Sequence, residues 1–522
     1  MTKTTIPAAM AAAMLSAAAA QAEWREARSP HFIVYSDDSE ANIRAQATRL
    51  ERFDAVVRHL QRVEEAPGEA SNPVTIYVVP NIDAVERLSG ADNVAGFYVP
   101  RVSGSVAFTP RRGDGAGDMN DLKPQIVLFH EYAHHLLLGN SRVAYPAWFS
   151  EGYAEFVSTM RMDADSALVG VAAQHRAYGL VVTSGISIEQ LFDPGRRKMT
   201  NAELDSLYGR GWLLTHYLIF DPTRMAKFKK YIELLNTGTP PLDAATKAFG
   251  DLKLLNRELQ RYLGGSKIPG LTVRYASLPD VKVTVGTVSP GAQALMPYRI
   301  RSTRGVDNKT AIPLYAKARA AASAYPDDAL AQGWLAEMAY DAGRDDEAEA
   351  AADRALAVDP KSIEALAYKA RVHLRRASAA PATDAKRWTE ARTWLVKANH
   401  IDPDSAEILS LFYDSFGYEH RQPTASAAKG LARAFELVPQ DRELRAAMVR
   451  QALIDNHLDD ARQLLRPLAF DPHASADNAA AKLLTILDGP GGAAAGLALM
   501  EQNAAAAAAP ATPGKSAPKS SD

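Results

Sequence analysis

HEYAHHLLLGNSRVAYPAWFSEGYAE, residues 130–155, is the stretch of this chain that says most about its fold and chemistry. His130 and His134 are four residues apart, so on an α-helix both imidazoles project from one face and can ligate one metal ion. Glu131 lies about 100° further round the same helix, within reach of a water molecule on that metal. Apolar residues from 126 to 138 predict the helix itself.

A second predicted helix supplies two carboxylates. Pro146 opens the stretch PAWFSEGYAEFVSTM, in which Glu151 and Glu155 are four residues apart and share a face. Catalytic zinc commonly takes three protein ligands, two His and one Glu among them, and keeps a fourth position for water. We therefore expect one Zn²⁺ per chain, bound by His130, His134 and Glu151. We expect Glu155 to accept the free ring N–H of a ligating histidine.

These motifs resemble those of a known enzyme family. HEYAH followed by WFSEGYAEF is similar to the gluzincins, which are zinc metallopeptidases of the peptidase MA type. The stretch YGRGWLLTHY, which begins at Tyr208, resembles the part of leukotriene-hydrolase-type aminopeptidases in which a tyrosine steadies the oxyanion, and this implies the same role for Tyr208. The resemblance covers about residues 24–265 and implies an α+β zincin-like catalytic domain. It implies peptide hydrolysis, with Glu131 as the base that takes a proton from water.

One motif of those aminopeptidases is missing. The 40 residues before His130 contain no G-x-M-E-N, with which that family anchors the free amine of a substrate. The resemblance therefore favours endopeptidase or oligopeptidase cleavage over aminopeptidase activity.

The N-terminus predicts export. Residues 1–22 combine one Lys with an Ala-rich apolar run and a small-x-small end, which is typical of a secretory signal peptide cleaved after Ala22. Cysteine is absent, so disulfides and thiolate zinc sites are excluded. No later stretch reaches about 18 uninterrupted apolar residues, so we expect no integral membrane segment. A net charge of -2 gives no electrostatic reason to expect nucleic-acid binding. The predicted location is periplasmic or secreted.

The region after the signal peptide predicts a small mixed sheet with helices. Residues 31–35 and 74–79 predict strands, residues 40–62 an amphipathic helix, and residues 94–109 a hairpin that turns near Ser103 and Gly104. The strand Ser105–Thr109 has two open interpretations. It could be a sheet edge that pairs with an extended substrate, or an ordinary hairpin strand that covers the core.

A repeat pattern follows. Prolines recur at positions 326, 360, 403, 439 and 472, and an alanine stands five residues before each of the first four, at 321, 355, 398 and 434. This resembles tetratricopeptide repeats, in which antiparallel helix pairs stack into a solenoid with a concave groove. The groove could bind a peptide or a partner protein, or the repeats could only stabilise or dimerise the first domain. The predicted organisation is a signal peptide (1–22), a metallopeptidase domain (23–265), a linker with extended segments (266–308), an all-α repeat solenoid (309–485) and a disordered low-complexity tail (486–522).

Two classes of function remain open. The first is an exported zinc peptidase whose substrate is a peptide or protein and whose repeats bind substrate or a partner protein. The second is a repeat-based adaptor or assembly factor with an inactive metallopeptidase-like domain. The presence of Glu131 favours the enzyme. Three further histidines carry no assigned role: His135 is expected to pack or face solvent, and His175 and His216 could line the cleft, although nothing in their spacing requires it.

Overall fold

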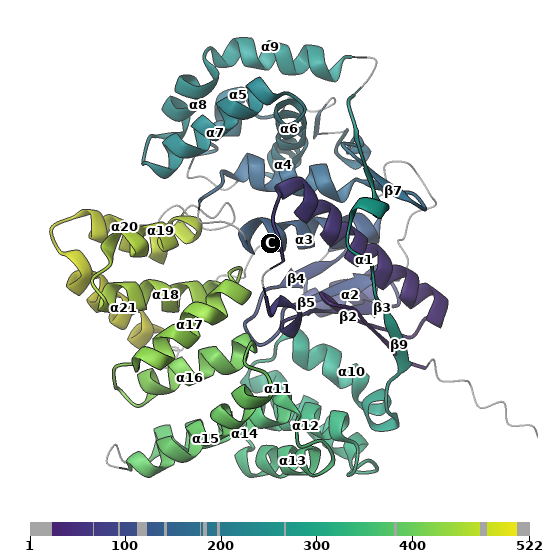
Figure 1. The fold of residues 1–522 in the computed structure, drawn as a ribbon, viewed down its shortest axis with the longest axis vertical. Coiled ribbons are helices and arrows are strands. Elements are labelled where there is room, and N and C mark those ends of the chain that lie inside the picture. Colours follow the sequence, from purple (N-terminus) through teal and green to yellow (C-terminus); the bar gives the residue numbers. More distant parts are fainter. Residues whose placement is uncertain are drawn as a thin grey trace, which may run out of the picture.

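The computed structural model describes most of the chain. The predicted signal peptide and residues 509–522 of the predicted tail lie outside the described part. The expected fold class is confirmed, because an N-terminal mixed α/β region is followed by a long run of paired helices (Figure 1). The described residues are 23–65, 67–91, 94–111, 123–139, 143–177, 179–180, 185–195, 199–265, 268–380, 384–469 and 478–508.

A six-stranded sheet forms the centre of the N-terminal region. β2, β3 and β5 run parallel, whereas β1, β4 and β9 pair antiparallel to their neighbours. The strands, in their order across the sheet, are β4 (Phe97–Val99), β5 (Val106–Pro110), β3 (Val74–Val79), β2 (Phe32–Ser36), β1 (Arg25–Arg28) and β9 (Thr284–Thr287). The predicted strands and the predicted hairpin are therefore present.

One interpretation of the hairpin is wrong. β5 lies between β4 and β3, so its backbone is already paired on both sides and Ser105–Thr109 is not a sheet edge. Both strands of the hairpin belong to the sheet, and its first strand, β4, takes the edge position instead.

Helices cover both faces of this sheet. Successive residues of a strand point to opposite faces, so Val34 and Ile76 contact the core under α1 (Glu40–Gln61) and α3 (Pro124–Gly139). Tyr35 and Tyr77 point the other way, into a second core formed with α10 (Pro290–Arg304) and α12 (Ala329–Asp341). The ring of Tyr35 meets that of Trp334 edge to face at 6.2 Å. The first helices of the repeat region therefore complete the core of the sheet.

The predicted linker is part of the fold. Within residues 266–308, β8 (Leu271–Arg274) extends a small sheet with β6 (Arg161–Met162) and β7 (Ser166–Val169). β9 pairs with β1 along its whole length. Helix α10 also begins inside this segment, at Pro290, where the sequence predicts a linker with some extended segments. The Thr and Val residues of β8 and β9 are held by strands far away in the sequence.

Most of the remaining helices of the N-terminal region lie beyond α3, at the top of Figure 1. A short helix, α2 (Ile82–Ser89), follows β3 and lies over the sheet. The others are α4 (Ala147–Ser158), α5 (Ile188–Phe192), α6 (Asn201–Ile219), α7 (Pro222–Asn236), α8 (Pro241–Phe249) and α9 (Leu252–Leu263).

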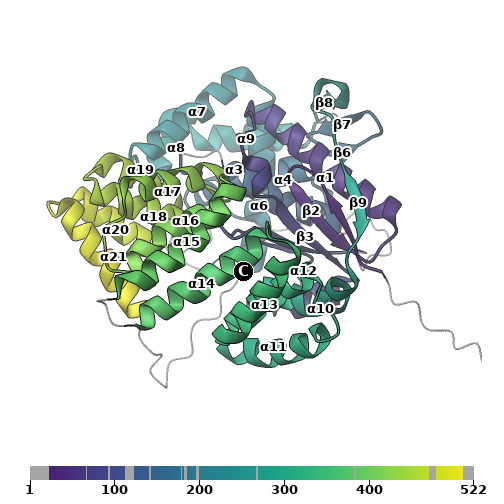
Figure 2. The ribbon, with the colours of Figure 1, turned by 60° about the horizontal axis from the view of Figure 1, so that its bottom comes forward.

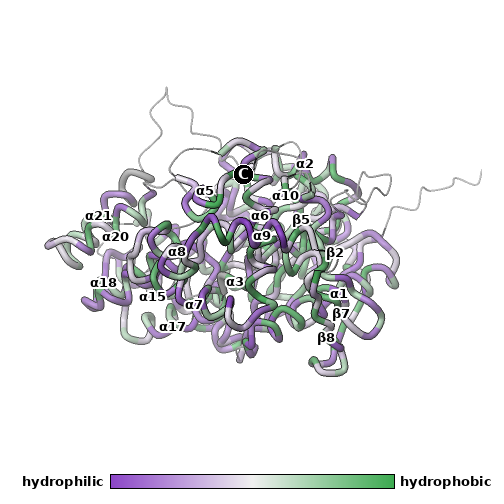
Figure 3. The backbone as a smooth tube through the Cα atoms, turned by 90° about the horizontal axis from the view of Figure 1, so that it is seen from above, coloured by the Kyte–Doolittle hydropathy of each residue, from purple (hydrophilic) through white to green (hydrophobic). Residues whose placement is uncertain are grey.

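The repeat helices run as a curved array from beneath the sheet round one side of it (Figures 1 and 2). Ala355, Ala398 and Ala434 are fully buried, as the repeat pattern predicts. Hydrophilic and hydrophobic residues alternate along these helices, which is the pattern of amphipathic packing (Figure 3). Besides α10 and α12, the helices of the array are α11 (Asn308–Ala322), α13 (Asp345–Val358), α14 (Ile363–Ala379), α15 (Ala385–Ile401), α16 (Ala406–Tyr418), α17 (Ala425–Leu437), α18 (Arg442–Ile454), α19 (Leu458–Ala469), α20 (Ala479–Asp488) and α21 (Gly492–Ala508).

The prediction of disorder from residue 486 onward is wrong for its first part. α20 ends at Asp488 and α21 continues to Ala508, because Leu497 and Met500 give the Ala-rich segment an apolar side that packs on the last repeat. Among the described helices, none combines the length and the apolarity that a membrane span needs.

The repeats also contact the hairpin of the sheet. The backbone N–H of Val102, in the turn between β4 and β5, donates to Asp441 Oδ2 at 2.8 Å. Arg101 donates from its guanidinium to the carbonyl oxygen of Arg304 at 3.0 Å. The array therefore touches the N-terminal region at the sheet face and at the β4–β5 turn.

Candidate metal centre

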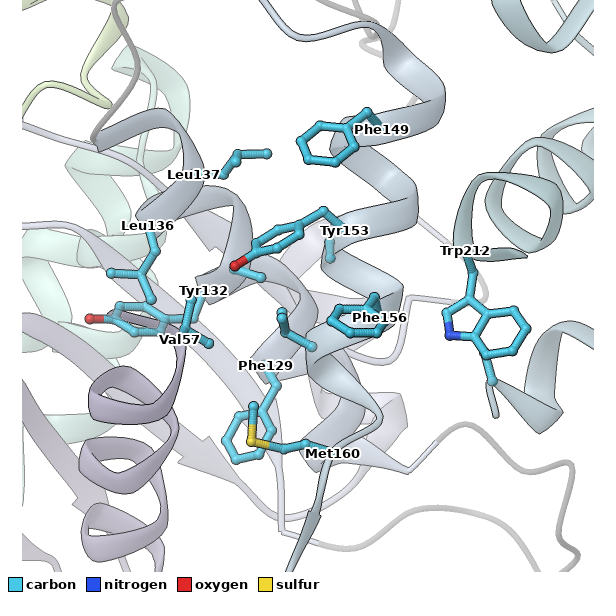
Figure 4. Close-up of a cluster of buried hydrophobic side chains, with 14 of the residues drawn as sticks. Val57, Phe129, Tyr132, Leu136, Leu137, Phe149, Tyr153, Phe156, Met160 and Trp212 are labelled. Atoms are coloured by element: carbon cyan, nitrogen blue, oxygen red, sulfur yellow. The ribbon is translucent and has the colours of Figure 1, made fainter. Parts of the chain in front are cut away.

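Helices α3 and α4 pack side by side, and this packing unites the two halves of the motif. Leu136 of α3 and Phe149 and Tyr153 of α4 belong to one buried core (Figure 4). The boundaries of α3 and α4 agree with the predicted helices, and Pro146 directly precedes α4. The His-bearing face of α3 therefore meets the Glu-bearing face of α4.

A third helix, α6, approaches α4 at van der Waals distance between backbones. A Cβ on Gly152 would lie 2.2 Å from the carbonyl carbon of Gly211, and a Cβ on Gly211 would lie 2.4 Å from the carbonyl oxygen of Trp148. Only residues without a Cβ allow this approach. Because Tyr208 is one turn before Gly211, and Glu151 is next to Gly152, the contact brings the tyrosine to the carboxylate.

The three predicted ligands converge. His130 Nε2 lies 3.2 Å from both Glu151 Oε2 and His134 Nε2, and His134 Nε2 lies 3.4 Å from Glu151 Oε2. Glu151 is only 1% exposed and His130 9%, whereas His134 is half-buried. These three side chains form a group that could hold a metal ion.

The donor atoms fit such an ion. Ligands about 2.0–2.2 Å from a tetrahedral zinc ion are about 3.3–3.6 Å apart, close to the three distances found here. His130 Nδ1 lies 3.5 Å from Glu155 Oε1, and His134 Nδ1 lies 3.3 Å from Ser150 Oγ. These contacts let each Nδ1 carry the proton and leave each Nε2 with a lone pair. The Nε2 lone pairs of His130 and His134 and the carboxylate oxygen of Glu151 converge on one point, where a cation could accept all three.

The surroundings are electronegative. Burial by itself lowers the pKa of His130, but its hydrogen bond to Glu151 and the charges of Glu155, Glu151 and Glu131 outweigh burial, so the pKa is raised. A positive charge is therefore favoured between these groups. Glu131 is half-buried on α3, and its charge acts on both His130 and Tyr208.

Glu155 lies behind His130 and is held by two residues that the sequence reasoning left out. His175 Nε2 lies 2.8 Å from Glu155 Oε2, and the guanidinium of Arg176 donates to Glu155 Oε1 at 2.7 and 2.8 Å. These contacts outweigh burial and lower the pKa of Glu155 to about 2, so the carboxyl is ionised. The sequence pattern assigns no role to His175 or Arg176. Neither residue belongs to a recognisable motif.

Tyr208 lies within α6 at the edge of the group. Its ring stacks on His130 with a centroid distance of 5.8 Å and an interplanar angle of 22°. Burial, and then the charge of Glu151, raise the pKa of Tyr208 well above its usual value. The hydroxyl therefore stays protonated and available as a donor. In the resembling family the tyrosine precedes a helix start, whereas here it lies in mid-helix.

His135 and His216 lie in packed surroundings away from the three proposed ligands. His135 Nδ1 lies 2.5 Å from the Tyr98 hydroxyl, and its ring stacks on Tyr132, so the expectation of a packing role is confirmed. His216 is fully buried, with Nδ1 2.9 Å from the Tyr262 hydroxyl and Nε2 3.1 Å from the carbonyl oxygen of Gly170.

Comparisons with known proteins leave the function open. No protein-family model matches the chain, and no curated protein sequence matches it. Solved structures do match, among them the MamA RS-1 ArsTM double mutant, which is 14% identical. That match covers 37% of this chain and 100% of the other, with a TM-score of 0.27. A likeness at this level adds nothing to the assignment of a function, which has to be argued from the site.

Proposed function

We propose that this chain is an exported zinc-dependent peptidase that cleaves internal peptide bonds of peptides or proteins. The observation that carries the proposal is the convergence of His130, His134 and Glu151, with donor atoms 3.2–3.4 Å apart, beside Glu131 and Tyr208. The resemblance of HEYAH and WFSEGYAEF to the gluzincins supports the same reaction.

The residues have complementary roles in this reaction. His130, His134 and Glu151 hold the zinc ion, which when bound makes water acidic and polarises the scissile carbonyl. Glu131 takes a proton from the attacking water and later gives it to the leaving nitrogen, as the C–N bond breaks. The Tyr208 hydroxyl donates a hydrogen bond to the oxygen on which negative charge develops. Glu155 fixes the ring of His130 through the Nδ1 proton.

The repeats and the N-terminus complete the proposal. Stacked helix pairs offer an extended concave surface, and such surfaces commonly bind peptides or partner proteins. We infer that the array binds substrate or a partner protein, and it contacts the N-terminal region at the β4–β5 turn. The predicted signal peptide implies action in the periplasm or outside the cell.

Replacing Glu131 by Gln tests the catalytic role. E131Q keeps the shape of the side chain but removes its basicity, so it should bind zinc with the affinity of the parent and lose peptide hydrolysis. Glu233→Gln, at an exposed position of α7, is the matched control and should cleave normally. Cleavage is measured on a mixed peptide library by mass spectrometry, and zinc by metal analysis of the purified protein. Equal turnover by E131Q and the parent would exclude Glu131 as the base.

The second candidate is an adaptor whose metallopeptidase-like domain is inactive. The extensive repeat array favours it, because a protein-binding scaffold needs no chemistry. A parent protein that holds one zinc ion per chain but cleaves no member of the library would support the adaptor over the peptidase.

A further inference from the structure

The turn that holds Glu155 also reaches Tyr208. His175 and Arg176 belong to one short 3₁₀ turn, Gln174–Arg176, which lies next to α6. Arg176 makes three contacts at once. It pairs with Glu155 at 2.7 Å, pairs with Asp205 at 3.3 Å, and lies over the ring of Tyr208 with its central carbon 4.6 Å from the ring centroid. The guanidinium of Arg176 thus contacts both Glu155, which lies next to His130, and the ring of Tyr208.

The ion pair between Arg176 and Glu155 matters because both side chains are largely removed from water. Glu155 is 1% exposed and Arg176 has only 22% of its side chain exposed. A carboxylate removed from water in this way requires a cation and well-formed hydrogen bonds. Arg176 supplies two donors in a planar fork, and His175 occupies the other carboxylate oxygen. Glu155 Oε1 also lies 3.5 Å from His130 Nδ1.

The turn is fitted closely against α6. A Cβ on Gly209 would lie 2.9 Å from Leu180 and 3.3 Å from the carbonyl oxygen of Arg176. Gly209 follows Tyr208 directly, and Asp205 is one helical turn before Tyr208. The position of Arg176 is therefore fixed from two sides, by a close backbone approach and by the ion pair with Asp205.

We propose that Arg176 is a positioning residue that fixes Glu155 and the Tyr208 ring in their places, and so couples metal affinity to the geometry of the oxyanion donor. Through Glu155 it orients His130 for the metal, and through cation–π contact and Asp205 it holds the tyrosine. This inference rests on the proposed metal site, and its catalytic part on the proposed peptidase activity.

Three variants separate the two connections. Arg176→Gln removes the charge and the fork, and should weaken zinc binding by about 10–100-fold, the range found for loss of outer partners of metal ligands. Arg176→Lys restores the charge without the fork, so its zinc affinity should lie between those of R176Q and the parent. Asp205→Asn leaves Glu155 paired, so it should keep zinc affinity within about twofold and lower kcat with little change in KM. Arg161→Gln, at an exposed arginine paired with exposed Asp163, is the matched control and should behave as the parent.

Zinc affinity is measured by competition with a fluorescent chelator, which requires no turnover. Weakened zinc binding in R176Q, with partial rescue in R176K, supports the inference even if the parent cleaves no peptide, in which case only the peptidase proposal fails. If R176Q misfolds, R176K carries the test, because it keeps the buried charge. The inference is overturned if zinc binding by R176Q, or by R176K in that case, equals that of the parent. It is equally overturned if the parent binds no zinc.

Discussion

Adding one methyl group at Gly152 should disturb both the stability and the chemistry of this protein. The Cβ of Gly152→Ala would lie 2.2 and 2.3 Å from the carbonyl carbon and oxygen of Gly211, and 2.8 Å from Thr215 Oγ1. Two of these three atoms belong to the backbone of α6 and cannot turn aside, so α4 and α6 must separate. Overpacking of this kind costs about 1–3 kcal/mol, and the backbone clash puts G152A at the upper end. The better helix propensity of Ala offsets at most about 1 kcal/mol, so we expect a net loss of about 2 kcal/mol.

Gly417→Ala is the matched control. Gly417 lies in α16 with no atom within 4 Å of an added Cβ, so only the helix propensity changes and G417A should gain about 0.5–1 kcal/mol. The assay is urea denaturation of the parent and both variants, together with zinc titration. Separation of α4 from α6 would also displace Glu151, which faces His130 and His134 from α4, so G152A should bind zinc more weakly. Parental stability and zinc affinity in G152A would refute the argument that glycine is required where these helices cross.

Three further changes test other parts of the structure. Tyr208→Phe should lower kcat by about 10²–10³-fold in a peptide-cleavage assay, because the oxyanion donor is lost, whereas zinc affinity should change far less, because Tyr208 is not a zinc ligand. Glu151→Gln should weaken zinc binding by more than about 100-fold in chelator competition, since it removes a charged ligand and not merely an outer partner. The third change concerns His31, whose burial lowers its pKa but whose hydrogen bond to Glu51 and nearby charges raise it to about 9. The resulting stabilisation is fully present below pH 6.5 and is lost as pH rises through about 9, so the stability difference between the parent and His31→Gln in urea denaturation should shrink between pH 6 and pH 10. A difference that stays constant or grows over this range would contradict the ion pair.

Local patterns were sufficient where neighbouring residues determine the structure. The amphipathic run predicted for residues 40–62 is α1, which ends at Gln61, and the strand predicted at 74–79 is β3 without a shift. The spacing of His130, His134 and Glu151 was informative because each pair shares a helix face or is joined by one short connection.

Long-range pairing was beyond the same reasoning. β9 hydrogen-bonds to β1, although most of the N-terminal region separates the two strands in the sequence. No local feature of the Thr-Val-Gly-Thr sequence of β9 indicates that it pairs with β1. His175 and Arg176 reach Glu155 from a single 3₁₀ turn about 20 residues away, which is too short to show periodicity. A usable signal did exist for α21, since Leu497 and Met500 are three residues apart within the Ala-rich stretch.

The shared core between the sheet and the repeats has a consequence for incomplete copies of this protein. A chain that stops before α10 would leave Tyr35, Tyr77 and Phe108 uncovered. Rings of about 150–250 Å² each amount to an apolar patch as large as any that soluble monomers normally tolerate. Such a fragment would aggregate or be degraded by quality-control proteases. The N-terminal region would therefore persist only in chains that also carry the first helices of the array, which bury that face of the sheet.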